Sequence, residues 1–157
     1  SVNMSAQSIG CPKWVRTLED GLQRSPDLAR NLILEMTEKS VMAAPEVARY
    51  FMNDMQKLGL CFAIDNFGAG QTSLVQLRDF YFGIIKMDGQ FTKNLAQSAD
   101  SQALIQAVIG IAGSFEMFCV AQNVETASDA EVLTTLGVDC LQGYHLGVPT
   151  LTPPWRQ

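Results

Sequence analysis

The chain has 157 residues and a formal net charge of −5 at pH 7, a size that fits one domain with a sizeable core. Its 11 Lys and Arg residues are scattered along the sequence, which excludes a general nucleic-acid-binding surface. No apolar run approaches the roughly 18 residues of a membrane-spanning helix, and no signal peptide opens the chain. We therefore expect a soluble domain without a membrane segment.

Six short apolar runs recur along the chain, and each ends in or contains a polar residue that could reach a ligand. The runs are residues 1–5, 31–38, 61–67, 84–88, 118–124 and 140–146. The polar residues are Asn3, Glu35, Asp65, Lys86, Gln122 and Gln142. Helix-like sequence separates most of the runs, which is typical of parallel βα units. A polar residue repeated at strand ends predicts a barrel-like active site, although a doubly wound sheet also collects polar residues there.

The length limits how much of a barrel the chain can form. A complete (β/α)₈ barrel needs about 250 residues, so these runs predict an α/β fold with about six βα units of a partial TIM-type (β/α) barrel. The first strand signal begins at Ser1. We interpret residues 1–157 as one N-terminally truncated domain that lacks the first two barrel strands. Open sheet edges would then favour a homo-oligomer or a longer native chain.

The helical segments support this alternation of strands and helices. Apolar residues at helical spacing predict a helix that starts at Pro45 and closes at Gly59, and a second helix over residues 101–115. A third helix over residues 128–137 has Ser128 and Glu131 at the spacing of a capping box. A shorter helix is expected between Trp14 and Leu22.

The cysteines indicate a reducing compartment. Cys11, Cys61, Cys119 and Cys140 show no CxxC pairing, and three of them lie in apolar strand candidates. We interpret them as buried reduced thiols rather than as a metal cluster or a disulfide framework. The cytoplasm is the predicted location.

The strongest local motif is DNFGAGQTSL, from Asp65 to Leu74. A hydrophobic strand delivers a carboxylate to its C-terminal end, and Gly68 and Gly70 let the following loop adopt backbone angles that other residues resist. A polar strand end followed by an ordinary glycine turn would give the same pattern, so this motif alone leaves both interpretations open.

Together with five other motifs, this segment resembles the EAL domain, the cyclic di-GMP phosphodiesterase module of bacterial signalling proteins. The motifs are SVNMSA from Ser1, LEMTE from Leu34, DNFGAG from Asp65, IKMD from Ile85, AQNVET from Ala121 and QGYHLGVP from Gln142. They occur in the family's order and at compatible spacings across nearly the whole chain. The resemblance implies a βα barrel that hydrolyses cyclic di-GMP to pGpG.

The resemblance also implies two Mg²⁺ or Mn²⁺ ions, which clamp the scissile phosphate and generate a hydroxide nucleophile. Asn3, Glu35 and Asp65 match metal-ligand positions of the family. Carboxylate and amide oxygens are the ligands that such hard cations prefer.

Four further residues match other functional positions. Lys86 matches a lysine near the attacking water and the phosphate, and Gln142 matches the glutamine of the last strand. Glu38 and Glu125 match acidic residues that position the site or its loop. Without the resemblance, solvated or capping roles would be the expected ones for both glutamates.

The departures from the family pattern concern the acidic residues. Asn66 replaces the second of two adjacent aspartates, and a neutral amide does not bridge two metals as a carboxylate does. Gln122 replaces a functional glutamate, and glutamine neither accepts a proton as a general base nor binds Mg²⁺ as strongly. Asn123 replaces the usual glycine, and the EAL signature, expected upstream of Ser1, is absent.

These departures predict a degenerate EAL-type domain without useful phosphodiesterase activity. Fewer anionic ligands raise the cost of holding two adjacent dications. A regulatory or protein-interaction role with a protein partner is the favoured interpretation. The alternatives are a metal-dependent phosphodiesterase in a longer native chain and a cyclic di-GMP receptor that binds without hydrolysis.

Overall fold

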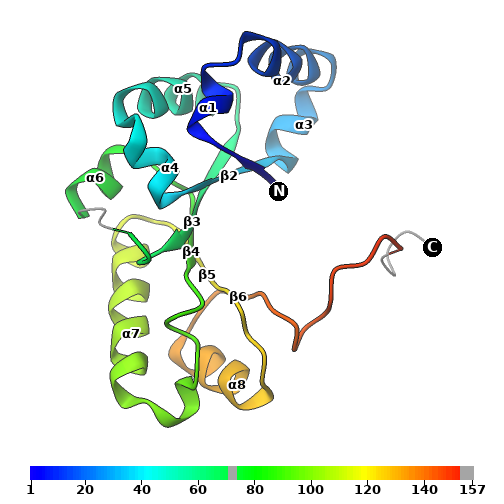
Figure 1. Ribbon diagram of the computed structural model, residues 1–157. Helices are drawn as coiled ribbons and strands as arrows, with labels where there is room; N and C mark the ends of the chain where they lie inside the picture. Colours follow the sequence, from blue (N-terminus) through cyan, green and yellow to red (C-terminus); the bar gives the residue numbers. More distant parts are fainter. Residues whose placement is uncertain (71–73, 153–157) are drawn as a thin grey trace.

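Six parallel strands form one sheet in the computed structural model, which describes residues 1–70 and 74–152 (Figure 1). The strands are β1 (Val2–Met4), β2 (Ile33–Thr37), β3 (Cys61–Phe67), β4 (Ile84–Met87), β5 (Phe118–Ala121) and β6 (Cys140–Leu141). Each strand pairs with the next one along the chain, and every pairing is parallel. This topology confirms the partial TIM-type barrel expected from the sequence. Residues 71–73 of the motif that starts at Asp65 lie outside the described residues.

Helices connect the strands. They are α1 (Ala6–Ile9), α2 (Pro12–Arg24), α3 (Pro26–Asn31), α4 (Glu38–Ala43), α5 (Pro45–Lys57), α6 (Leu74–Asp79), α7 (Ala99–Ser114) and α8 (Ala127–Leu136), with a 3₁₀ helix, η1 (Leu95–Gln97). In Figure 1 they are arranged around the sheet, from α2 and α5 at the top to α7 and α8 at the bottom. Among the described residues, the helices are too short or too polar for any of them to cross a membrane.

The predicted helices are present, with corrections at their ends. Pro45 occupies the first turn of α5, and Gly59 follows its end with a φ of 93°. The helix predicted between Trp14 and Leu22 is longer, because α2 spans Pro12–Arg24. The predicted capping box of α8 is wrong: Thr126 is the N-cap, and its hydroxyl accepts a hydrogen bond from the Asp129 amide at 3.1 Å.

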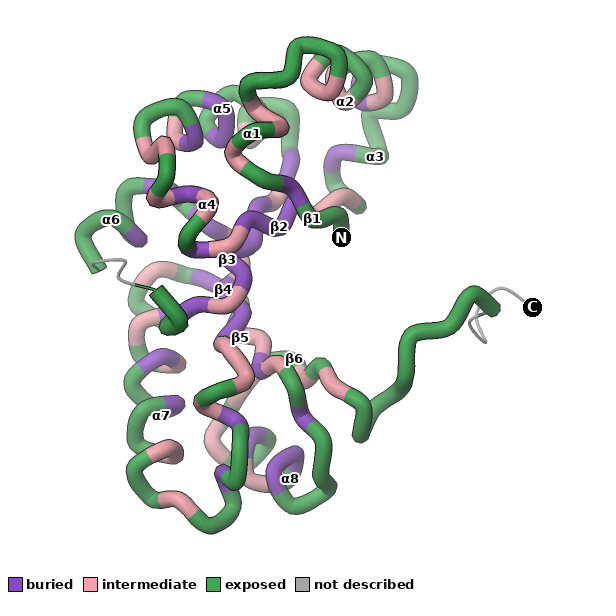
Figure 2. Tube along the Cα trace, viewed as in Figure 1, coloured by how far each residue is buried: buried purple, intermediate pink, exposed green. Residues whose placement is uncertain are grey.

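The strands divide their side chains between two faces. Leu34, Met36, Phe62, Ile64 and Ile85 are almost completely buried and belong to the hydrophobic core. Because side chains alternate along a strand, the residues between them face the other side of the sheet. Figure 2 shows that burial is concentrated in the central strands, whereas the C-terminal segment is exposed. The alternation therefore places the polar residues of β2, β3 and β4 together on the face opposite the core.

The burial of the cysteines differs from the sequence prediction. All four are free thiols, but Cys11 and Cys140 are exposed, Cys61 is half-buried and only Cys119 is buried. Cys140 is exposed because it lies on β6, an outer strand of the sheet. Burial raises the pKa of the Cys119 thiol to about 11 and also raises the pKa of Cys61.

These differences predict selective labelling by a thiol reagent such as DTNB. At pH 8 only roughly a thousandth of Cys119 is thiolate, so it reacts far more slowly than the exposed Cys11 and Cys140. Peptide mass spectrometry after a short exposure to the reagent measures the labelling of each thiol. In urea all four cysteines are expected to react alike, and equal labelling of Cys119 and Cys11 in the native chain would contradict the prediction.

Candidate active site

A buried lysine between two carboxylates forms the centre of the polar face. The Lys86 ammonium lies 2.5 Å from Glu35 Oε2 and 3.3 Å from Asp65 Oδ1. The three residues come from neighbouring strands and are all less than 10% exposed. Buried charges are tolerated when they are paired in this way. The structure thus brings together three of the residues that the sequence singled out.

Burial and the neighbouring Lys86 together change the pKa of the Glu35 carboxyl group. Burial by itself raises the pKa of the carboxyl group, but the hydrogen bond and charge of Lys86 act in the opposite direction. The pKa of Glu35 is held below its ordinary value as a result. Glu35 is therefore ionised at neutral pH, and the ion pair with Lys86 is fully formed.

Two amide side chains complete the surroundings of Asp65. Gln122 donates a hydrogen bond from Nε2 to Asp65 Oδ1 at 2.9 Å, and Asn66 donates from Nδ2 to Oδ2 at 3.0 Å. Asn66 has a φ of 54° and sits where the register between β3 and β4 shifts. Asparagine tolerates this left-handed conformation better than most residues do. Both amides act here as donors, and Gln122 Oε1 is buried with no hydrogen-bond partner among the described residues.

Glu38 holds the glycine-containing loop that follows β3. Its carboxylate accepts hydrogen bonds from the backbone amides of Gly68 and Gly70, at 3.0 and 3.1 Å. Gly68 has a φ of 93°, and a Cβ atom at Gly70 would lie 2.6 Å from Glu38 Cδ. Both glycines are thus required by the loop geometry, one by its backbone angle and the other by the close approach of Glu38.

The turn at residues 88–92, after β4, connects the loops that follow β3 and β5. Gln90 donates from Nε2 to the Gly68 carbonyl at 2.8 Å, and a Cβ atom at Gly68 would lie 2.3 Å from the Phe91 ring. Thr92 donates from Oγ1 to the Gln122 carbonyl at 2.8 Å. Sequence reasoning missed these three residues, because no local pattern reveals partners 22 and 30 positions away.

Asn123 packs against the same turn. It has a φ of 56°, a left-handed conformation that glycine and asparagine adopt at low cost. A Cβ atom at Gly89 would lie 2.1 Å from Asn123 Nδ2. The absence of a side chain at Gly89 therefore makes room for the one at Asn123.

This packing predicts coupling between the two positions. Gly89→Ala is expected to lower the free energy of unfolding by about 1–3 kcal/mol, because the new methyl group collides with Asn123. Asn123→Gly removes the obstacle, so the double variant should regain most of the loss. Urea unfolding of the four chains gives the coupling energy, and additive losses would contradict the contact. Gly110→Ala is the matched control, since nothing lies within 4 Å of a Cβ atom there.

Asn3, Glu125 and Gln142 lie outside the buried cluster around Lys86. Asn3 is exposed on β1, in register with Glu35. Glu125 and Gln142 are exposed and line a pocket of about 330 Å³ with Asn123 and Tyr144. The structure therefore places Glu125 and Gln142 in an exposed pocket beside β6, apart from the buried cluster around Lys86, and leaves Asn3 on the opposite outer strand.

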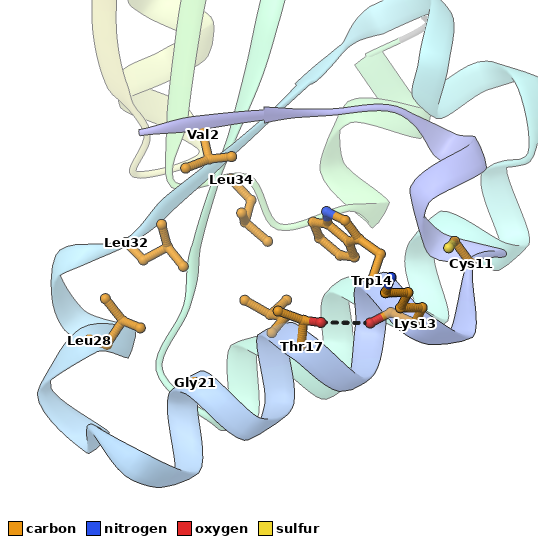
Figure 3. A pocket seen from close by; sticks show the side chains of 10 residues that line it. Val2, Cys11, Lys13, Trp14, Thr17, Gly21, Leu28, Leu32 and Leu34 are labelled. Carbon is orange, nitrogen blue, oxygen red and sulfur yellow. Dashed lines mark hydrogen bonds between the residues drawn. The ribbon is translucent and has the colours of Figure 1, made fainter.

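A second, apolar groove lies on the other face of the sheet (Figure 3). It has a volume of about 550 Å³ and is lined mainly by side chains of β1, β2, α2 and α3. They include Val2, Trp14, Leu18, Leu28, Leu32 and Leu34. Thr17 contacts the groove but donates its hydroxyl hydrogen to the Lys13 carbonyl within α2. None of the residues that line this groove belongs to the charged cluster around Lys86.

The model of the EAL domain family matches residues 1–149 of the chain. The chain belongs to the EAL domain family. It is 32% identical over 149 residues to the bifunctional diguanylate cyclase/cyclic di-GMP phosphodiesterase MucR of Pseudomonas aeruginosa, a match that covers 95% of this chain and 22% of MucR. It is 28% identical to the cyclic di-GMP phosphodiesterase PdeF of Escherichia coli, covering 95% of this chain and 20% of PdeF.

Solved structures of similar proteins share the fold. The cyclic di-GMP complex of the MucR phosphodiesterase has a TM-score of 0.86 and 31% identity, and the match covers 99% of this chain and 62% of that one. The manganese and cyclic di-GMP complex of BlrP1 from Klebsiella pneumoniae has a TM-score of 0.81 and 28% identity, covering 91% of this chain and 37% of BlrP1. The chain spans about a fifth of the length of these curated relatives, and less than two thirds of either solved chain.

The donor set of this EAL domain does not fit a pair of divalent cations. The described part of the chain contains no group of three or more His, Cys, Asp or Glu side chains placed to hold a metal ion. Glu35 and Asp65, the two carboxylates among the residues expected from the sequence to bind metal, are already paired with Lys86. The amides of Asn66 and Gln122 present hydrogens, not oxygens, to Asp65.

Proposed function

We propose that this EAL domain does not turn over cyclic di-GMP and acts as a regulatory or protein-interaction module of a bacterial cyclic di-GMP signalling protein. The observation that carries this proposal is the surroundings of Asp65, whose two oxygens accept hydrogen bonds from Gln122 and Asn66. At these two positions the family pattern has carboxylates. Loss of both removes a general base and a bridging ligand from the same corner of the site.

The electrostatics of the cluster support the proposal. Two anionic side chains and one cationic side chain leave it with a single net negative charge. Two dications about 4 Å apart repel each other by roughly 16 kcal/mol at an effective dielectric constant of 20, and surrounding carboxylates must offset that repulsion. Glu35 and Asp65 cannot do so while they neutralise Lys86.

The direct test is hydrolysis of cyclic di-GMP in the presence of Mn²⁺, with pGpG measured by chromatography. We expect no turnover above the blank, while the phosphodiesterase domain of MucR serves as the positive control. The same assay on a chain extended upstream by two further βα units, which we propose complete the barrel, tests the alternative that activity needs those units. Turnover above the blank by either chain would refute the proposal.

A cyclic di-GMP receptor that binds without hydrolysis is the second candidate. The pocket lined by Asn123, Glu125, Gln142 and Tyr144 opens beside the carboxyl end of β6, where ligands of such barrels bind. The MucR and BlrP1 structures are complexes with cyclic di-GMP. Calorimetry with the ligand, with and without Mg²⁺, distinguishes this candidate from a module that recognises protein partners alone.

The outer strands supply the surface for protein partners in this proposal. β1 and β6 are the two outer strands of the described sheet, and edge strands readily pair with another chain. Self-association or a partner protein would cover them. Light scattering after size exclusion measures the oligomeric state.

We place the module in the cytoplasm, where free thiols such as Cys11 and Cys140 stay reduced.

A further inference from the structure

We infer that Asn66 and Gln122 take the place of divalent cations around Asp65, so that the polar cluster is stable without metal and closed to it. The inference rests on the proposed function, because it concerns the same site. It goes further in assigning a task to the two amides. Both amides donate hydrogen bonds that stabilise the buried carboxylate of Asp65. Their role is therefore not only the loss of two metal-binding carboxylates.

Both carboxylate oxygens of Asp65 are occupied by hydrogen-bond donors. Oδ1 receives the Gln122 amide at 2.9 Å and has the Lys86 ammonium at 3.3 Å, and Oδ2 receives the Asn66 amide at 3.0 Å. Asp65 is only 9% exposed. A buried carboxylate requires such donors, because an unpaired charge away from water is costly. Each oxygen of Asp65 already has one.

The Gln122 side-chain amide and a metal ion cannot both occupy the same side of Asp65. If the Gln122 amide rotated so that Oε1 faced Asp65, two oxygens without a hydrogen between them would lie at hydrogen-bond distance. A cation between them or a proton on Asp65 would be needed to relieve the repulsion. In the observed orientation Oε1 is buried without a partner among the described residues, which is a cost. The orientation is therefore set by the bond from Nε2 to Asp65.

The backbone around Asn66 and Gln122 holds both side-chain amides in place. Asn66 has a left-handed φ of 54° at the register shift of β3. The backbone carbonyl of Gln122 accepts a hydrogen bond from the Thr92 hydroxyl at 2.8 Å, and the backbone N–H of Gln122 donates to the Met87 carbonyl. Asn123, the next residue, packs against Gly89. A metal ion would have to displace two amides that the surrounding turns hold toward Asp65.

The experiment compares metal binding and stability with and without the amides. For the wild-type chain, titration with Mn²⁺ in a calorimeter should show no saturable binding up to about 1 mM, and the unfolding temperature should be equal in Mn²⁺ and EDTA. The variant Asn66→Asp, Gln122→Glu crowds four carboxylates around one lysine. Its unfolding temperature in EDTA should fall by several degrees, and 1 mM Mn²⁺ should raise it by about 4 °C or more.

A matched variant controls for the added charge. Asn53 on α5 and Gln7 on α1 are exposed, so Asn53→Asp, Gln7→Glu makes the same two chemical changes away from the site. Its unfolding temperature should respond neither to Mn²⁺ nor to EDTA. A metal response equal to that of the site variant would overturn the inference, because general electrostatics would then explain both.

The remaining outcomes are decisive as well. Saturable Mn²⁺ binding by the wild-type chain overturns the inference, whether or not the site variant folds, and so does a folded site variant without a metal response. If the site variant folds only in Mn²⁺, the inference is supported. The hydrolysis assay is independent: turnover without saturable Mn²⁺ binding refutes the proposed function alone, and saturable binding without turnover refutes this inference alone.

Discussion

Replacing Lys86 with methionine is expected to lower the free energy of unfolding by about 3–5 kcal/mol, the range seen when one partner of a buried ion pair is removed. Methionine fills a similar volume, so the loss comes from charge rather than from a cavity. Glu35 and Asp65 would remain buried on one face of the sheet without their cation. Urea unfolding at pH 7 measures the change.

The matched control is Lys57→Met. Lys57 lies 2.8 Å from Asp54 on α5, but both side chains are about 70% exposed. Solvent screening reduces such a pair to less than about 1 kcal/mol. If the two substitutions cost the same, the buried cluster does not contribute more to stability than a surface ion pair, and the interpretation of the Lys86 site is wrong.

The loss of unfolding free energy in Lys86→Met should also depend on pH. The pKa of Glu35 is held below its ordinary value of 4.5, so its ion pair stabilises the folded chain above that pH and the contribution is lost as pH falls through the folded pKa. Lys86→Met removes the cation that pairs with Glu35, so burial raises the pKa of the Glu35 carboxyl group. Protonation at low pH then removes its unpaired buried charge. The stability difference between the two chains should therefore shrink between pH 7 and pH 4, and a constant difference would argue against the mechanism.

The strands and the charged cluster could be predicted from the sequence because both depend on local patterns. A parallel strand that is buried on both faces has a short apolar run as its sequence pattern. A polar residue inside such a run is expected to lie close to the polar residues of the adjacent strands. Glu35, Asp65 and Lys86 follow this rule, and the structure places them within hydrogen-bond or ion-pair distance. The match to the EAL family covers the same residues.

The short helices and the turn at residues 88–92 could not be predicted in the same way. α1, α3, α4 and α6 have four to six residues, too few for a hydrophobic period to emerge, and packing decides whether such segments are helical. At α8 two cap spacings compete in the sequence, and Thr126 with Asp129 prevails over Ser128 with Glu131. The partner of Gln90 lies 22 positions away, which only the folded chain reveals.

The sequence also could not predict which end of the Asn66 and Gln122 side-chain amides faces Asp65. Asn66 and Gln122 could be recognised as neutral replacements for carboxylates, but an amide has both a donor and an acceptor end. Only the folded chain shows that each turns its nitrogen toward Asp65. That detail changes the interpretation of the site from one with weakened metal ligands to one whose carboxylate is already satisfied.

Replacing Glu38 with alanine is expected to lower the free energy of unfolding by about 3 kcal/mol. The carboxylate is 4% exposed and accepts hydrogen bonds from the amides of Gly68 and Gly70, and bonds to a charged acceptor contribute about 1.5–3 kcal/mol each. Alanine leaves both amides without that acceptor. Glu38→Gln keeps one acceptor oxygen but removes the charge, so it should lose less. Urea unfolding of the three chains gives the order.

A local measurement separates this contact from a general loss of stability. Hydrogen exchange at the Gly68 and Gly70 amides should accelerate in Glu38→Ala by more than the change in global stability requires, while core amides such as that of Ile64 follow the global change. Glu46→Ala on α5, which removes an exposed carboxylate paired with Arg49, should leave both glycine amides as they are. Since the same loop contacts Gln90 and Phe91, release of Glu38 should also loosen the turn at residues 88–92. Unchanged exchange at Gly68 in Glu38→Ala would mean that the turn, and not Glu38, holds this loop against β3.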